Sequence, residues 1–393
     1  MVQPVIIAAV RTPIGKFLGA LSSLAAVELA TYATREVLRR AQLPAAQIDE
    51  VIFGQVLQAG QGQNPARQVA LHSGLPPAVS AFTVNKVCGS GLKAVMLAAQ
   101  AIRAGDAQVV LAGGMESMSQ APFLLQGVRQ HWRYGHQQVH DALLRDGLCC
   151  AWENWHMGEA AEYIASKYGI TRAQQDAYAL ESHRRATHAW QQGYFRAETV
   201  PLTFTAQGQT RTVAQDEGFR PDTSLEALAK LPPAFHPQGT VTAGNSSMLS
   251  DGAAALLVAD SRVAERLRVR PLARILAYAT SGVAPKDLFI APVSAIRAVC
   301  DQAGFALRNI DLIEINEAFA AQMIACLREL ELPADKVNVH GGALALGHPI
   351  GASGARVLTT LLYALKQRQL RTGIAALCLG GGNAVAMLLE AIS

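Results

Sequence analysis

Charged side chains are scarce in this sequence of 393 residues. Asp, Glu, Lys and Arg together make up 16% of it, and no long run of one sign occurs. A disordered chain combines low hydrophobicity with high net charge, whereas here hydrophobic residues reach 50% and the net charge is +4. Disorder is therefore excluded. Nucleic-acid binding is excluded as well, because it needs clustered Lys and Arg, although a mild positive balance suits an anionic substrate.

Cysteine is also sparse. The six cysteines are scattered and do not resemble a disulfide framework, so a reducing cytoplasm is the expected location. The first residues carry no basic segment before the apolar run and predict a β-strand rather than a signal peptide. The longest late uncharged stretch, 374–389, contains three consecutive glycines and is too short to span a bilayer, so we expect no membrane association.

Residues with metal-ligand spacing are few. His136 and His140 are four residues apart, but no Glu stands beside the first and no Cys pair lies nearby. We interpret this segment as a solvated loop and expect no metal site.

Two segments of the chain resemble each other at a nearly constant spacing. "IDEVIFG" begins at Ile48 and is echoed by "IDLIEIN", which begins at Ile310. "GSGLKAVMLAAQAI" contains Ser90 and is echoed by "ASGARVLTTLLYAL", which contains Ser353. Each Ser-Gly segment has apolar residues at helical spacing and precedes an apolar, strand-like run rich in glycine. Two independent matches with one spacing predict a duplicated α/β domain.

The segment between the two copies has no counterpart in either. It is rich in His, Gln, Trp and Arg, and includes a long polar surface helix that begins at Thr171 with a capping box to Gln174. We expect an N-terminal domain over 1–120, completed by 250–270, a loop domain over 121–249, and a C-terminal domain over 271–393.

Three glycine-rich segments each contain a reactive side chain. "VCGSG" has Cys88, "HGGALALGHPIGASG" has His348 and "CLGGGN" has Cys378. Taken singly they are ambiguous, because a free cysteine is among the most buried residue types and glycine turns often serve packing. If the two copies pack about a pseudo-twofold axis, the three can converge on one site. Cys88 also precedes a predicted helix, whose N-terminus favours a thiolate.

The motifs of the chain, in the order in which they occur along it, resemble those of the thiolases, in particular the acetyl-CoA C-acetyltransferase (acetoacetyl-CoA thiolase) type. The resemblance covers nearly the whole chain and includes "VNKVCGSGLKA", "AGGMESMSQAP", "HMG", "RPDTSLEALAKLPPAF", "TAGNSS" and "NEAFA" besides the segments above. It implies a thiolase fold: duplicated α/β domains in five layers, α-β-α-β-α, with an inserted loop domain over the coenzyme A site. It also implies a homodimer or homotetramer.

The implied activity is reversible Claisen condensation of two acetyl-CoA to acetoacetyl-CoA plus CoA, within fatty acid metabolism. No cofactor is expected, because coenzyme A is itself a substrate and product. By resemblance, Cys88 is the nucleophile that becomes acetylated, His348 the base that activates it, and Cys378 the acid/base toward the α-proton. Asn316 orients a water that forms one oxyanion hole with His348; the backbone amides of Cys88 and Gly380 form the other.

The resemblance also implies a set of coenzyme A contacts. Arg220 belongs to the nucleotide end, Ser247 to the pantetheine region, and His156 and Met157 to the acyl and pantetheine pocket. Further expected contacts are Ala243, Phe235, Ala318 and Phe319. Without the resemblance, Arg220 would be interpreted as a solvated surface arginine and Met157 as a residue that packs in the hydrophobic core.

Some positions depart from the usual thiolase pattern. Met248 stands where the family has Gly, Asn383 and Ala384 stand where it has a hydrophobic residue and Gly, and "CCAWENWHMG" is rich in bulky residues. A larger residue at the acyl site would favour acetyl over longer chains. A broader-chain degradative 3-ketoacyl-CoA thiolase and a non-catalytic acyl-CoA-binding protein remain as alternatives, whereas a ketoacyl synthase would need a second His in place of Cys378.

Overall fold

The fold is built on one continuous sheet with two halves. The computed structural model describes residues 2–392, and residues 1 and 393, the outer ends of the predicted domains, lie outside it. The described strands follow the order β12-β13-β14-β11-β1-β10-β5-β3-β4, with β2 beside β10. Only two residue pairs join β1 to β11, so the two halves can separate into stacked layers.

The strand bounds follow the predicted repeat. The first half contains β1 (Pro4–Arg11), β2 (Gly15–Lys16), β3 (Glu50–Gly54), β4 (Ser80–Val84), β5 (Val109–Ser117) and β10 (Ser250–Asp260). The second half contains β11 (Ala273–Gly282), β12 (Leu312–Ile315), β13 (Thr372–Leu379) and β14 (Asn383–Ala391). The two echoed "ID" segments thus become equivalent strands, β3 and β12, which confirms the predicted duplication.

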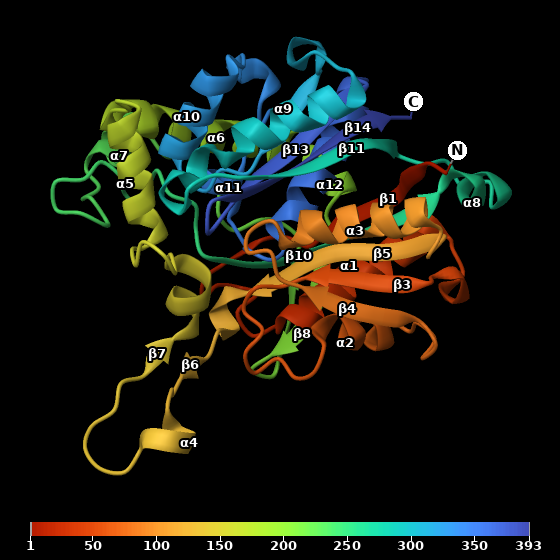
Figure 1. The fold of residues 1–393 in the computed structure, drawn as a ribbon, viewed down its shortest axis with the longest axis horizontal. Coiled ribbons are helices and arrows are strands. Elements are labelled where there is room, and N and C mark those ends of the chain that lie inside the picture. Colours follow the sequence, from red (N-terminus) through yellow and green to blue (C-terminus); the bar gives the residue numbers. More distant parts are fainter. Residues whose placement is uncertain (1, 393) are drawn as a thin grey trace.

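Helices complete five layers around the two half-sheets (Figure 1). The outer layer of the first half has α1 (Ala26–Ala41) and α2 (Pro65–His72); that of the second has α9 (Ala291–Ala303) and α10 (Ala320–Leu330). Between the half-sheets lie α3 (Ser90–Ala104) and α12 (Ser353–Arg368), the helices predicted from the repeated Ser-Gly segments. This arrangement confirms the predicted five-layer thiolase fold.

The strands alternate their side chains between an outer and a central core. On β5, Val109 and Leu111 pack toward the α1 and α2 layer, while Val110 and Ala112 pack toward α3 and α12. Successive strand residues point to opposite faces, so a strand covered on both sides must be apolar throughout. All nine residues of β5 are buried. This double burial explains the high hydrophobic content.

The two central helices cross at their first turns because glycine replaces a side chain there. A Cβ at Gly91 would lie 2.8 Å from the backbone nitrogen of Ala355, and one at Gly354 would lie 2.3 Å from that of Leu92. Both N-termini therefore reach the same end of the central layer. Gly105, with a φ of +86°, ends α3 at the predicted position.

The segment between the copies wraps both halves. It contains β6 (Phe123–Leu124), α4 (Val128–His131), β7 (His140–Asp141), a π-helical turn (Leu143–Leu148), α5 (Met157–Lys167), α6 (Arg172–Gln191), β8 (Leu202–Ala206), β9 (Gln209–Val213) and α7 (Leu225–Ala229). Leu202 and Phe204 of β8 join the core beneath α1. The expected polar surface helix is α6, but one face of this helix is buried, including Ala186 and Trp190. The division into three domains stays a prediction.

The β6–α4–β7 segment projects from the body as an arm (Figure 1). Several large apolar side chains on it are exposed, among them Phe123 at 68% and Tyr134 at 100%. The remaining helices are α8 (Ser261–Arg266) and α11 (Ala343–Leu346). Among the described residues, no helix combines the length and apolarity that crossing a bilayer requires.

Candidate active site

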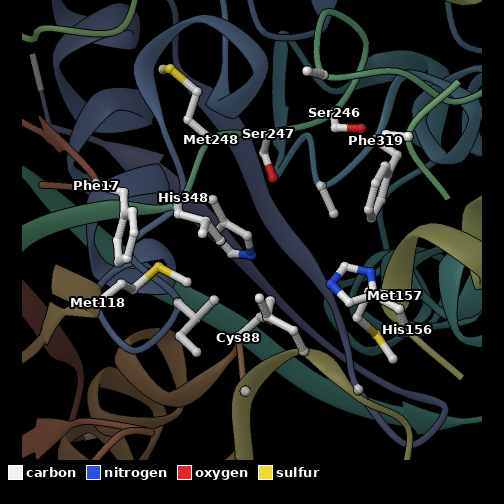
Figure 2. A pocket seen from close by; sticks show the side chains of 18 of the residues that line it. Phe17, Cys88, Met118, His156, Met157, Ser246, Ser247, Met248, Phe319 and His348 are labelled. Atoms are coloured by element: carbon white, nitrogen blue, oxygen red, sulfur yellow. The ribbon is translucent and has the colours of Figure 1, made fainter. Parts of the chain in front are cut away.

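A cavity of about 510 Å³ opens where the two central helices begin. Both halves of the sheet and the inserted segment line it. Every predicted site residue except Asn316 lies on its wall: Cys88, His348, Cys378, Gly380, Arg220, Ser247, His156, Met157, Ala243, Phe235, Ala318 and Phe319. Figure 2 shows His348 between two groups of side chains, with His156, Met157 and Phe319 on one side and Phe17, Met118 and Met248 on the other. The structure thus brings together residues that are far apart in sequence.

Cys88 sits on a strained turn between β4 and α3. The preceding residue, Val87, has a φ of +48°, which a β-branched residue rarely adopts. Ser90 holds this conformation, because its Oγ donates to the Val87 carbonyl at 2.6 Å and accepts from the Lys86 N–H at 2.8 Å. The turn also packs against β13, since a Cβ at Gly89 would lie 2.7 Å from the Leu379 side chain. Strain and packing together fix the sulfur at the pocket wall.

The surroundings of the Cys88 thiol act on its pKa in opposite directions. Burial raises its pKa to about 12, although the backbone N–H groups of Gly380 and Cys88 donate toward the sulfur and oppose the shift. The sequence predicted that the helix N-terminus favours a thiolate, and desolvation of the buried sulfur opposes that effect. The two N–H groups are the pair predicted for an oxyanion hole, and they point to the reacting sulfur.

His348 is held as a neutral base. Its Nδ1 lies 2.6 Å from the Ser353 Oγ, whose hydrogen is donated to the Pro349 carbonyl at 2.9 Å. Because that hydroxyl has no second hydrogen, Nδ1 must be the donor, which leaves a lone pair on Nε2. Burial first, and then the charge of Arg356, lower the pKa of His348 to about 3. A neutral imidazole with a free Nε2 can accept a proton.

Cys378 and Gly380 come from the end of β13. Cys378 is buried, and burial raises the pKa of its thiol well above the usual value. The strand then turns through Gly381 and Gly382, both at positive φ; a Cβ at Gly382 would lie 2.4 Å from the Val283 carbonyl oxygen. The glycines therefore permit the close backbone approach that the sequence suggested.

Asn316 lies behind His348 rather than on the cavity wall. Its side-chain nitrogen is 3.5 Å from Nδ1 and 3.4 Å from Nε2 of His348. Since it is nearly equidistant from both ring nitrogens, it makes no well-directed hydrogen bond to either. Its side-chain oxygen accepts from Arg356 Nη2 at 3.4 Å.

The opposite wall is aromatic and apolar. His156 stacks on Phe235 with ring centroids 4.8 Å apart, and Phe235 in turn meets the edge of Phe319. Packing explains the glycine of the "HMG" motif, because a Cβ at Gly158 would lie 2.2 Å from the Phe235 ring. Arg220 is exposed at the rim, where its backbone N–H donates to His183 Nδ1 at 3.1 Å. An apolar channel with a cation at its mouth suits a long ligand that ends in an anion.

Three buried residues near the site were missed in the sequence. Ser353 and Arg356 lie on α12, and Glu116 is the next-to-last residue of β5. The Glu116 carboxylate accepts hydrogen bonds from the backbone N–H groups of Val56, Leu57 and Gly351. Glu116 thereby ties the His348 loop to the first half, and burial raises its pKa to about 7. A signal was present for Arg356, since an arginine within the apolar run "ASGARVLTTLLYAL" is unusual in a buried helix.

The structure also places the departures from the thiolase pattern. Met248 lines the cavity, and a Cβ at Gly218 would lie 2.1 Å from its terminal methyl group. Asn383 instead accepts from Lys86 Nζ at 3.2 Å, and Ala384 packs in the second outer core. Trp152 is 70% exposed. Of these departures, Met248 alone lines the cavity, and its terminal methyl group packs on Gly218.

A duplicated five-layer fold with a cysteine, a neutral histidine and a second cysteine around one apolar cavity defines a thiol-dependent acyltransferase. Models of the thiolase N-terminal and C-terminal domains match residues 4–262 and 269–391. The chain is 52% identical over 390 residues to acetyl-CoA acetyltransferases of Escherichia coli (strain K12) and Pseudomonas aeruginosa, with 99% of each chain covered. The crystal structure of the Bacillus anthracis acetyl-CoA acetyltransferase matches with a TM-score of 0.98 at 43% identity, over 100% of this chain and 99% of that one. The chain belongs to the thiolase family.

Proposed function

We propose that this enzyme catalyses the reversible condensation of two acetyl-CoA molecules to acetoacetyl-CoA and CoA. The observation that carries the proposal is the convergence of Cys88, His348 and Cys378 on one apolar cavity. The printed names of the relatives, acetyl-CoA acetyltransferases, support the same substrate. A non-catalytic acyl-CoA-binding protein would not need two thiols and a base at one place.

In the first half-reaction, the Cys88 sulfur attacks the acetyl carbonyl while its proton passes to His348 Nε2. The transfer accompanies the attack, because the raised pKa of Cys88 prevents a free thiolate from accumulating. The N–H groups of Cys88 and Gly380 stabilise the developing oxyanion. The CoA sulfur leaves with the proton of Cys378, so an acetyl-cysteine and a Cys378 thiolate remain.

In the second half-reaction, the Cys378 thiolate removes an α-proton from a second acetyl-CoA. Its raised pKa suits this step, since a thiolate of high pKa is the stronger base. The resulting enolate forms a carbon–carbon bond to the acetyl group on Cys88. The Cys88 sulfur then leaves and recovers its proton from His348, which restores both groups.

The coenzyme A contacts are proposed along the aromatic wall. Arg220 would meet the nucleotide end at the rim, and Ser247, Ala243, Phe235, Ala318 and Phe319 would flank the pantetheine arm. His156 and Met157 lie on the same side of His348 as Phe319 (Figure 2), and we place the acyl and pantetheine groups against them. The proposed reaction needs no cofactor, because coenzyme A carries both acyl groups as a substrate.

We also propose a homodimer or homotetramer. The edge strand β4 presents an open backbone ladder among the described residues, with Phe82 exposed at 37%. Such an edge pairs readily with a second copy. The exposed apolar residues of the β6–α4–β7 arm would join two dimers. All six cysteines are free, which supports action in a reducing cytoplasm. A place in fatty acid metabolism is proposed from the acyl-CoA substrates alone.

The test is thiolysis of acetoacetyl-CoA with free CoA, compared with a long-chain 3-oxoacyl-CoA. We expect efficient cleavage of the short substrate alone, because Met248 stands on the cavity wall where the family has Gly. The variant Cys88→Ala should lose turnover by at least about 10³-fold while it keeps its fold. Preference for the long substrate would favour a degradative 3-ketoacyl-CoA thiolase, and cleavage of neither would overturn the proposal.

A further inference from the structure

Among the described residues, Arg356 is a buried cation without a direct ion pair. It lies on α12, three residues after Ser353, and is 1% exposed between the two halves of the molecule. The other fully buried arginine, Arg11, is paired with Glu198 and with Asp216 at 2.7 Å. Among residues 2–392, Arg356 has no carboxylate within ion-pair distance, and its Nε and Nη1 have no hydrogen-bond partner.

Such an arginine costs stability. The desolvation cost of a buried charge must be offset by ion pairs and hydrogen bonds. A well-packed apolar side chain of similar volume often gives a more stable fold. The neighbours of Arg356 on α12, Val357 and Leu358, show that apolar residues pack well in this layer. A destabilising residue next to a reaction centre suggests a role in the reaction.

The one hydrogen bond that Arg356 makes decides the orientation of Asn316. A guanidinium can only donate, so the atom of Asn316 that faces Nη2 at 3.4 Å must be the oxygen. The amide nitrogen must then face the opposite way, toward the ring of His348. Without Arg356, the Asn316 side chain could turn over, so that its oxygen, an acceptor, would face His348 in place of the N–H donor.

We propose that Arg356 is a positioning residue for the acyl-transfer reaction: it keeps the Asn316 N–H donor turned toward His348, and so orients the oxyanion hole that Asn316 and His348 are expected to form through a water. The inference rests on the proposed condensation. An N–H donor that is already oriented stabilises developing negative charge without reorganisation.

Several buried charged groups surround Arg356. Burial raises the pKa of Glu314, on β12, to about 8, and the charge of Arg356 opposes that shift. The charge of Arg356 helps to lower the pKa of His348 and so keeps Nε2 unprotonated. The other charged groups that act on Arg356 are Arg11, Glu198 and Glu317.

The test compares Arg356→Met with Arg356→Lys and with Arg368→Met, an exposed arginine on the same helix. Arg356→Met should lower the kcat of condensation about 10- to 100-fold with little change in KM. Its melting temperature should be unchanged or higher, because an unpaired buried charge has been removed. Arg356→Lys should recover part of the kcat, and Arg368→Met should behave as wild type.

A second readout needs no condensation. Alkylation of Cys88 by iodoacetamide at pH 7 should become several-fold faster in Arg356→Met, because His348 becomes more basic without the nearby cation. A purely structural role would instead slow both reactions together and lower the melting temperature, and that result would overturn the inference. Wild-type kcat and alkylation in Arg356→Met would also overturn it. Wild-type protein without condensation activity would refute the proposed function, while the alkylation comparison would still show whether Arg356 acts on His348.

Discussion

Cys88 owes its position to its neighbours rather than to its own chemistry. The strained Val87, the Ser90 hydrogen bonds and the Gly89 contact with β13 place the sulfur beside the Gly380 amide. The sequence predicted which residues converge, because the motifs carried that information. It did not predict their protonation, since burial depends on the whole fold.

The protonation of Cys88 can be measured by its reactivity. Since burial raises the thiol pKa to about 12, the thiolate fraction should grow about tenfold per pH unit between pH 7 and 9. The rate of Cys88 alkylation by iodoacetamide should therefore rise without a plateau over this range. Peptide mass spectrometry would separate Cys88 from the exposed Cys149. A plateau already at pH 7 would instead show a resting thiolate–imidazolium pair.

At the scale of elements, the crossing of α3 and α12 builds the site. Their first turns meet through Gly91 and Gly354, and this contact brings the Cys88 turn and the His348 loop to one cavity. The repeated Ser-Gly segments predicted both helices and their relation. The buried face of α6 escaped prediction, because a polar sequence gives no sign of the neighbours that cover it.

The helix crossing predicts a large effect of one methyl group. Gly354→Ala should destabilise the fold by about 3 kcal/mol, because its Cβ would meet the backbone of Leu92, which cannot move aside as a flexible side chain does. Gly282→Ala is the matched control, since the nearest atom to its Cβ is 3.8 Å away. Denaturant unfolding measures both. Equal stability of the two variants would contradict the role of the crossing.

At the scale of the whole molecule, the open edge at β4 and the projecting arm are the features that a single chain leaves unexplained. Both carry exposed large hydrophobic residues, such as Phe82 and Phe123. The sequence assigned the arm to the insertion but could not show that it leaves the body, since its short apolar runs resemble buried ones. Association with further copies would cover both features.

The proposed assembly predicts the effect of a charge on the edge strand. Phe82→Asp should dissociate the oligomer, because a buried carboxylate at a strand–strand interface would be left without a partner. Leu225→Asp, on exposed α7, is the control and should leave the mass unchanged. Light scattering measures both masses. A wild-type monomer, or an unchanged mass for Phe82→Asp, would contradict pairing through β4.

The central claim is that Cys88 carries the acetyl group between two thioesters. The most direct measurement is peptide mass spectrometry of the protein after brief incubation with acetyl-CoA alone and acid quenching. We predict one acetyl group on Cys88, its transfer to CoA on addition of free CoA, and no label at this position in Cys88→Ala. An unlabelled Cys88 in protein that still cleaves acetoacetyl-CoA, or an acetyl group on another cysteine such as Cys378, would contradict the account.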